Sequence, residues 1–66
     1  MSNPRREAEL EALTLELHQN GHATRSREWL EEIFGNDAAK WIRIKKYLEK
    51  HNLKGDVLPS QFLFTN

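Results

Sequence analysis

The sequence predicts an all-α domain of three helices with a C-terminal tail, and two observations support this. Three segments carry apolar residues at helical spacing, and glycines follow the first two, at Gly21 and Gly35. With 66 residues and no cysteine, the chain has room for one small domain whose core disulfides cannot supplement. We expect one domain over residues 1–66, with helices at about 4–20, 25–34 and 37–52 and a tail at 53–66.

The first helix is expected to begin at Pro4, because proline favours a first helical turn, and to end at Asn20-Gly21. Its core face carries three leucines at helical spacing: Leu10, Leu13 and Leu17. A second, narrower apolar stripe lies nearly opposite: Ala8, Ala12 and Leu15. A helix that is apolar on two sides has something packed on both, so the second stripe predicts contact with the tail or with another subunit.

The second helix is expected to follow a cap at Thr24 or Ser26 and to end at Gly35. Its apolar residues form a broad arc: Trp29, Leu30, Ile33 and Phe34. Such an arc is typical of a short helix that packs against its neighbours on most of one side.

The third helix is expected to begin at a cap on Asn36 or Asp37 and to run to about Asn52. Trp41, Ile44 and Leu48 share one face and are expected to point into the core. A line of residues runs along the opposite side: Ala39, Arg43, Lys46 and Lys50. On its own, such a basic line is more typical of a solvated helix face than of a binding surface.

The tail reads either as two very short strands or as an extended arm with Ser60 capping a last turn. Pro59 does not suit the turns that tight hairpins prefer, which counts against the first alternative. The apolar residues left over are candidates for an interface with a partner: Ala8, Ala12, Leu15, Phe62 and Phe64. The alternative is that these residues bury one another within the monomer, as a domain this small needs.

Charge is balanced overall but not along the chain. Residues 1–34 hold four Lys or Arg against seven Asp or Glu, whereas residues 35–66 hold six against three. A zero net charge counts against strong non-specific binding of polyanions, but the basic half can still present a local positive surface. The sequence has no stretch approaching a membrane span and no signal-peptide pattern, so we expect a cytoplasmic protein without membrane contact.

The sequence contains no residue pattern typical of a catalytic site or a metal site. The serines and aspartates are few, no glycine-rich phosphate loop is present, and a domain of this size has little room for an active-site pocket. His18 and His22 are four residues apart, but Asn20-Gly21 ends the helix between them, so the two imidazoles do not align. We expect no enzyme activity, no metal site and no cofactor.

The segment from Arg27 to Ile44 resembles a helix-turn-helix of the DNA-binding type. The resemblance is carried by apolar positions in two successive helices and by the glycine between them: Leu30, Phe34, Gly35, Trp41 and Ile44. Two residues differ from the usual pattern. Glu31 occupies a position that is usually a small residue, because the two helices cross closely there, and Asn36 replaces an apolar residue.

This resemblance implies a helix-turn-helix-like domain whose third helix, residues 36–50, is the recognition helix, with the tail extended or forming a short β-wing. Candidates for base contacts are Asn36, Ala39, Lys40 and Arg43. Candidates for phosphate contacts are Arg25, Arg27, Lys46 and Lys50. The implied function is a small regulator of transcription or replication that binds double-stranded DNA, often as a homodimer. The alternative is a protein-interaction module, an adaptor or an inhibitor, that binds an unidentified protein and no nucleic acid.

Overall fold

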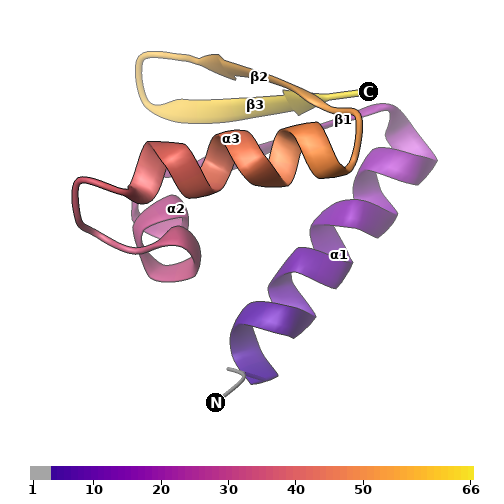
Figure 1. Ribbon diagram of the computed structural model, residues 1–66. Helices are drawn as coiled ribbons and strands as arrows, with labels where there is room; N and C mark the ends of the chain where they lie inside the picture. The colour runs from indigo at the N-terminus through magenta and orange to yellow at the C-terminus, as the bar shows by residue number, and fades with distance from the viewer. Residues whose placement is uncertain (1–3) are drawn as a thin grey trace.

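The computed structural model describes residues 4–66, in which the elements follow in the order helix, strand, helix, helix, strand, strand (Figure 1). The elements are α1 (Pro4–Asn20), β1 (His22–Ser26), α2 (Arg27–Phe34), α3 (Lys40–Lys50), β2 (Lys54–Val57) and β3 (Gln61–Thr65). The fold is therefore α+β, and the expectation of an all-α domain is wrong. The first helix has the expected bounds, but strands replace the N-terminal part of the expected second helix and most of the tail.

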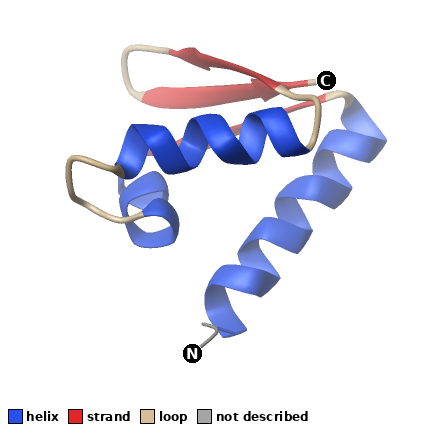
Figure 2. Cartoon of the chain, in the orientation of Figure 1, coloured by secondary structure: helices blue, strands red, loops and turns tan. Residues whose placement is uncertain are grey.

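The three strands form one antiparallel sheet in the order β1-β3-β2, so the last strand lies in the middle. In this register Phe64 faces Ala23 on one side and Gly55 on the other. Figure 2 shows α3 running alongside the strands of the sheet, with α1 leading through a short turn into β1. The buried side chains come from all three helices and from one face of the sheet: Leu13, Leu17, Ala23, Leu30, Ile33, Phe34, Ile44, Phe62 and Phe64.

Strand β1 is the element that sequence periodicity misses. Its five residues include one buried apolar side chain, Ala23, because the strand lies at the edge of the sheet. What orders the strand is its pairing with β3, a contact between residues some forty positions apart that no local pattern reveals. Ser26 then ends the strand and caps α2, as one of the two expected caps, and its Oγ accepts a hydrogen bond of 3.1 Å from the backbone N–H of Trp29.

The tail forms the β2–β3 hairpin, and this decides between the two alternatives left open for it. Pro59 lies at the hairpin's tip, where its missing N–H costs nothing, and the N–H of Leu58 donates to the carbonyl of Gln61 at 2.9 Å. Gly55 lets the hairpin close on the core, since a Cβ there would lie 2.5 Å from Cζ of Phe62. Phe62 and Phe64 are consequently buried, so the expectation that they face a partner is wrong for this chain.

The third helix begins at Lys40, three residues later than expected. Ile44 is fully buried and Leu48 is half-buried, but Trp41 is 48% exposed, so its expected place in the core is wrong. The reason is that Trp41 lies in the first turn of α3, at the rim of the sheet, where its ring contacts Phe62 from one side (centroids 5.9 Å apart).

Candidate nucleic-acid interface

The inner side of α3 is held by an aromatic cluster, and this fixes which side faces outward. Beside the buried Ile44, the ring of Tyr47 packs edge-on against Phe34 and Phe64, with centroids 5.7 and 6.4 Å away. Edge-to-face pairs of this kind add about 0.5–1.5 kcal/mol each beyond the apolar area they bury. The helix therefore has one rotational position about its axis, and the opposite side is left to solvent.

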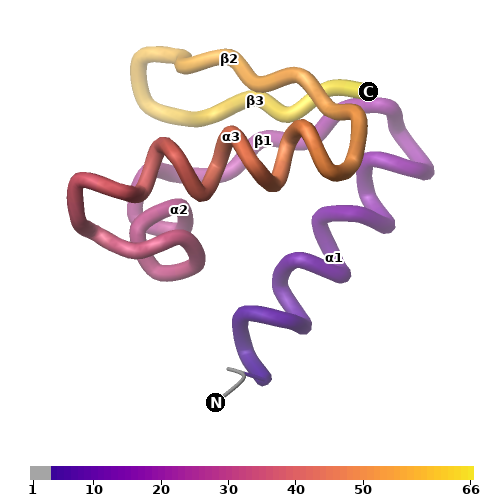
Figure 3. The backbone as a smooth tube through the Cα atoms, in the orientation of Figure 1, coloured from indigo at the N-terminus to yellow at the C-terminus, as the bar shows by residue number. Residues whose placement is uncertain are grey.

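The turn that joins α2 to α3, residues 35–39, is held by Arg43 (the loop at the left of Figure 3). The guanidinium of Arg43 donates to the backbone carbonyl of Phe34 at 2.9 Å and to both carboxylate oxygens of Asp37, at 2.8 and 3.2 Å. Asp37 in turn accepts from the backbone N–H of Ala39 at 3.1 Å, just ahead of the helix. The hydrogen bond from Arg43 lowers the pKa of the Asp37 carboxyl, which keeps it ionised and paired.

The turn requires glycine at position 35 for two separate reasons. Its φ of 99° lies in the region that residues with a side chain rarely adopt. A Cβ at this position would also lie 2.6 Å from Nη1 of Arg43, in the space that the guanidinium occupies. The glycine expected to open the turn is therefore required both by the backbone and by the arginine that spans the turn.

Five exposed residues form what we call the outer face of α3: Ile42, Lys45, Lys46, Glu49 and Lys50. Ile42 is 58% exposed and lies on the same side of the helix as Lys46. None of the three lysines takes part in an ion pair with another residue of the described chain, 4–66. The outer face thus carries three lysines against one glutamate, a net positive charge, beside one exposed apolar side chain.

Two of the arginines expected to contact DNA are engaged within the protein instead. Arg43 holds the turn, as described above. Arg25 pairs with Glu16 at 2.9 Å and lies over the ring of Trp29, with its guanidinium carbon 5.4 Å from the centroid. Its side chain is only 17% exposed, so it faces the junction of α1 and α2 rather than the outer face.

The other expected contact residues divide into three groups. Lys46 and Lys50 belong to the outer face, whereas Asn36 and Ala39 lie in the turn before α3. Arg27 and Lys40 border a recess of about 180 Å³ between the start of α3 and the hairpin. Trp41 and Val57 also line this recess, and Nζ of Lys40 lies 5.2 Å from the Trp41 ring, a cation–π distance.

Sequence reasoning missed Ile42 and Lys45 as members of the outer face. Both could have been found from the helical wheel, since Ile42 lies two positions from the buried Ile44 and so points nearly the opposite way. Trp41 was expected to be buried, and this placed the expected core face of the helix closer to Lys45 than it is in the structure, where Trp41 is exposed.

Within residues 4–66, no group of three or more His, Cys, Asp or Glu side chains is arranged to hold a metal ion. In the same part of the chain, no helix combines the length and the apolar character needed to cross a membrane. His18 and His22 are both exposed, at the end of α1 and the start of β1.

The outer face of α3 is thus the candidate site that the geometry supplies, and it stands on that geometry alone. No protein-family model matches the chain, and neither does a curated protein or a solved structure.

Proposed function

We propose that this chain is a small DNA-binding protein that uses α3 as its recognition helix and regulates transcription or replication in the cytoplasm. The observation that carries the proposal is the outer face of α3, where Lys45, Lys46 and Lys50 surround Ile42 and form no ion pair with any residue of the described part of the chain, 4–66. Lysines of this kind release counterions when they meet phosphates, which is the main source of affinity for DNA. An α-helix also fits the width of the major groove.

The order of the elements supports the same proposal. Helix-turn-helix domains of the winged kind combine two successive helices with a β-hairpin beside the second one. Here α2 and α3 are followed by the β2–β3 hairpin, with strand order β1-β3-β2. The hairpin tip, residues 58–60, carries no basic side chain, so α3 has to supply most of the contacts.

In this proposal the side chains have different tasks. Lys45, Lys46 and Lys50 contact phosphates and fix the register of the helix on the duplex. Ile42 contacts the methyl group of thymine, the apolar feature of the major groove, while Asn36 and Lys40 approach base edges near the start of the helix. Arg43 is not a contact residue but holds the turn that positions the helix.

Self-association is a further part of the proposal, because helix-turn-helix regulators commonly bind as dimers on paired half-sites. The candidate surface is the exposed stripe of α1: Ala8, Ala12 and Leu15. Leu15 is 56% exposed and is the largest apolar side chain of the stripe. We expect the wild type to be a dimer and Leu15→Asp to be a monomer when their masses are measured by light scattering. A wild-type protein that is monomeric at high concentration would contradict the proposed self-association.

The experiment that tests DNA binding is fluorescence anisotropy with mixed-sequence duplex DNA at low salt. We expect micromolar or tighter binding by the wild type and a loss of about 100-fold in the Lys45/Lys46/Lys50→Ala variant, since each phosphate contact contributes on the order of 1 kcal/mol. The control is Arg5/Lys54→Ala, which removes two positive charges at exposed positions outside the outer face and outside the groove that Lys46 and Lys50 line. Equal loss in both variants, or no binding by the wild type, would overturn the proposal.

A second candidate function is a protein-interaction module, and the exposed apolar side chains favour it. Trp41, Ile42 and Val57 are 48%, 58% and 61% exposed, more large apolar surface than a DNA-binding face needs. The anisotropy experiment separates the candidates. Under this second function, wild-type protein shows no salt-dependent binding of DNA.

A further inference from the structure

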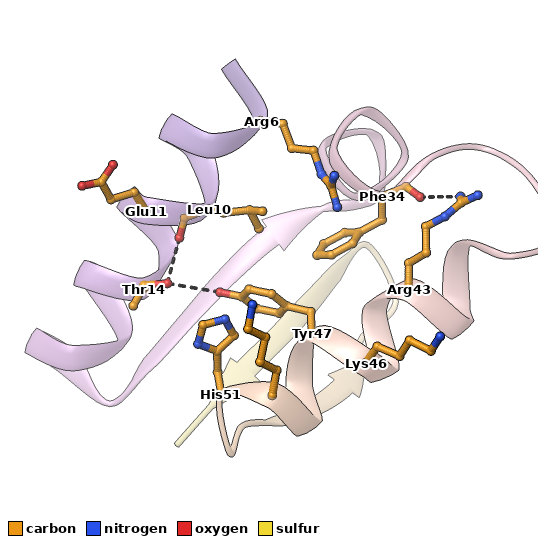
Figure 4. A pocket seen from close by; sticks show the side chains of 10 residues that line it. Arg6, Leu10, Glu11, Thr14, Phe34, Arg43, Lys46, Tyr47 and His51 are labelled. Carbon is orange, nitrogen blue, oxygen red and sulfur yellow. Dashed lines mark hydrogen bonds between the residues drawn. The ribbon is translucent and has the colours of Figure 1, made fainter. Parts of the chain in front are cut away.

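A groove of about 430 Å³ opens between α1 and α3, on the side of α3 next to the outer face (Figure 4). Pockets that hold small molecules typically measure about 300–1,000 Å³, so this groove lies at the lower end of that range. It is separate from the recess beside Trp41, since the two have no residue in common. None of the roles proposed above for α3 requires a hollow at this position.

The floor of the groove is apolar and largely aromatic. Leu10 enters it from α1, Phe34 from the end of α2 and Tyr47 from α3 (Figure 4). Phe34 is buried, and the half-buried Tyr47 packs edge-on against it, so the floor is rigid. A floor of this kind suits a flat apolar or aromatic body, which would bury its faces against ring edges and aliphatic carbons.

The rim of the groove is positively charged. Lys46 and Lys50 line it from α3. Figure 4 shows Arg6 reaching from α1 toward the ring of Phe34, while the ammonium of Lys46 points away from the floor, so the exposed Lys46 side chain has to rotate to meet an occupant. Glu11 is the acidic residue that also lines the groove, and its carboxylate is directed away from the aromatic floor (Figure 4). Within residues 4–66 neither lysine takes part in an ion pair, and Glu11, the carboxylate among the lining residues, is directed away from the floor. Both observations favour a negatively charged occupant.

A hydrogen-bond donor lies between the floor and the rim. The hydroxyl of Thr14 donates to the carbonyl of Leu10 at 2.9 Å, so in its 3.3 Å contact with Tyr47 the Tyr47 hydroxyl is the donor. A separation of 3.3 Å is long for a bond between two oxygens. The Tyr47 hydroxyl can therefore turn to a charged acceptor in the groove and lose little, because hydrogen bonds to ions are the stronger ones.

We infer that the groove between α1 and α3 binds a small organic anion, an aromatic or flat apolar carboxylate. Its apolar body lies on Leu10, Phe34 and Tyr47, and its carboxylate meets Lys46, Lys50 and the Tyr47 hydroxyl. This inference shares Lys46 and Lys50 with the proposed DNA contacts but does not depend on DNA binding, since the floor and the hydrogen-bond donor play no part in contacts with DNA.

The test is a titration followed by two-dimensional ¹H–¹⁵N NMR, without DNA. The probe is naphthalene-2-carboxylate, and the matched neutral ligand is naphthalene-2-carboxamide, which has the same ring but no charge. We expect saturable changes in the amide signals of Leu10, Thr14, Phe34 and Tyr47, with a dissociation constant in the millimolar range or below. We expect the carboxamide to bind about fivefold more weakly, the loss of roughly one charge contact.

Two protein variants complete the test. Lys46→Gln/Lys50→Gln removes the charge of the rim and is expected to weaken binding of the carboxylate about fivefold or more. Lys45→Gln/Lys54→Gln removes the same charge from exposed positions outside the groove and is expected to leave the affinity unchanged. All four lysines lie at the surface or in solvent-facing positions, so both variants should fold.

The inference is overturned by any of the following results. The first is the absence of saturable changes in the wild type. The second is a set of changes centred on Trp41 and Val57, which would assign the ligand to the other recess. The third is equal affinity for the carboxylate and the carboxamide, or equal affinity in the two double variants. Because DNA is absent, failure here leaves the proposed function standing, and failure of DNA binding leaves this site standing.

Discussion

The two sides of α3 use similar residues for different purposes. On the inner side Ile44 is 1% exposed, and on the outer face Ile42 is 58% exposed, although the two lie in the same helical turn. The basic residues divide in the same way, since Arg43 is bound to Asp37 and to the Phe34 carbonyl while Lys46 has no ion pair within residues 4–66. A basic helix is therefore not a uniform surface: one of its charges stabilises the fold, and the others remain for a ligand.

The largest effect should come from the matched pair of isoleucines. We expect Ile44→Ala to lower the free energy of unfolding by about 2–5 kcal/mol, because it removes buried carbons and leaves a cavity. In Ile42→Ala the removed carbons are already in water, so the change should stay within about 0.5 kcal/mol. Urea denaturation followed by circular dichroism measures both. Similar losses in the two variants would mean that α3 is rotated from the position described.

The next effect tests the turn that holds α3. Gly35→Ala should cost about 1–3 kcal/mol, because φ of 99° strains any residue with a Cβ. Part of this cost should come from the collision with Arg43, so the loss in Gly35→Ala should be smaller when Arg43→Ala is already present. A double-mutant cycle by urea denaturation gives the coupling. Strict additivity of the two changes would contradict the close approach of Gly35 and Arg43.

A smaller effect concerns pH. Because the pKa of Asp37 is lowered in the folded state, mainly by the hydrogen bond from Arg43, its contribution is present above the unfolded pKa of about 4 and is lost as pH falls through the folded value. Asp37→Asn should therefore be less stable than the wild type at neutral pH, and the difference should shrink below about pH 4. Thermal unfolding at a series of pH values measures this. Asp56→Asn, on the hairpin, is the control, and a difference for Asp37→Asn that stays constant with pH would contradict the pairing.

Much of the helical part of this fold can be read from the sequence, and the sheet cannot. Helix α1 and the cap of α2 follow local rules of spacing and hydrogen bonding, so the helix was predicted and the cap was narrowed to Thr24 or Ser26, of which the structure uses Ser26. Strand β1 depends on pairing with β3 at the other end of the chain, and its one buried side chain, Ala23, gives no alternating pattern. The expectation of an all-α domain failed for this reason.

The candidate site was predicted in part, for a related reason. Lys46 and Lys50 were expected on a helix face turned away from the core, and they lie on the outer face of α3. Arg43 was assigned to DNA from its place on the basic line of the helix. The structure instead pairs it with Asp37, which lies in a turn whose course depends on the φ of Gly35 and so is not visible in helical spacing. Helical spacing predicts the direction of a side chain, but it does not predict which loop residue lies close enough to bind it.

The central claim is that the lysines of the outer face of α3 meet the phosphates of DNA. The measurement that tests it most directly is the slope of log affinity against log salt for duplex DNA, compared between the wild type and single Lys45→Ala, Lys46→Ala and Lys50→Ala variants. The slope is negative, and we predict that each substitution reduces its magnitude by about 0.9, the contribution of one phosphate contact. Lys54→Ala should leave the slope unchanged. Slopes equal to that of the wild type in all three variants would contradict the claim and leave this face as a solvated helix surface.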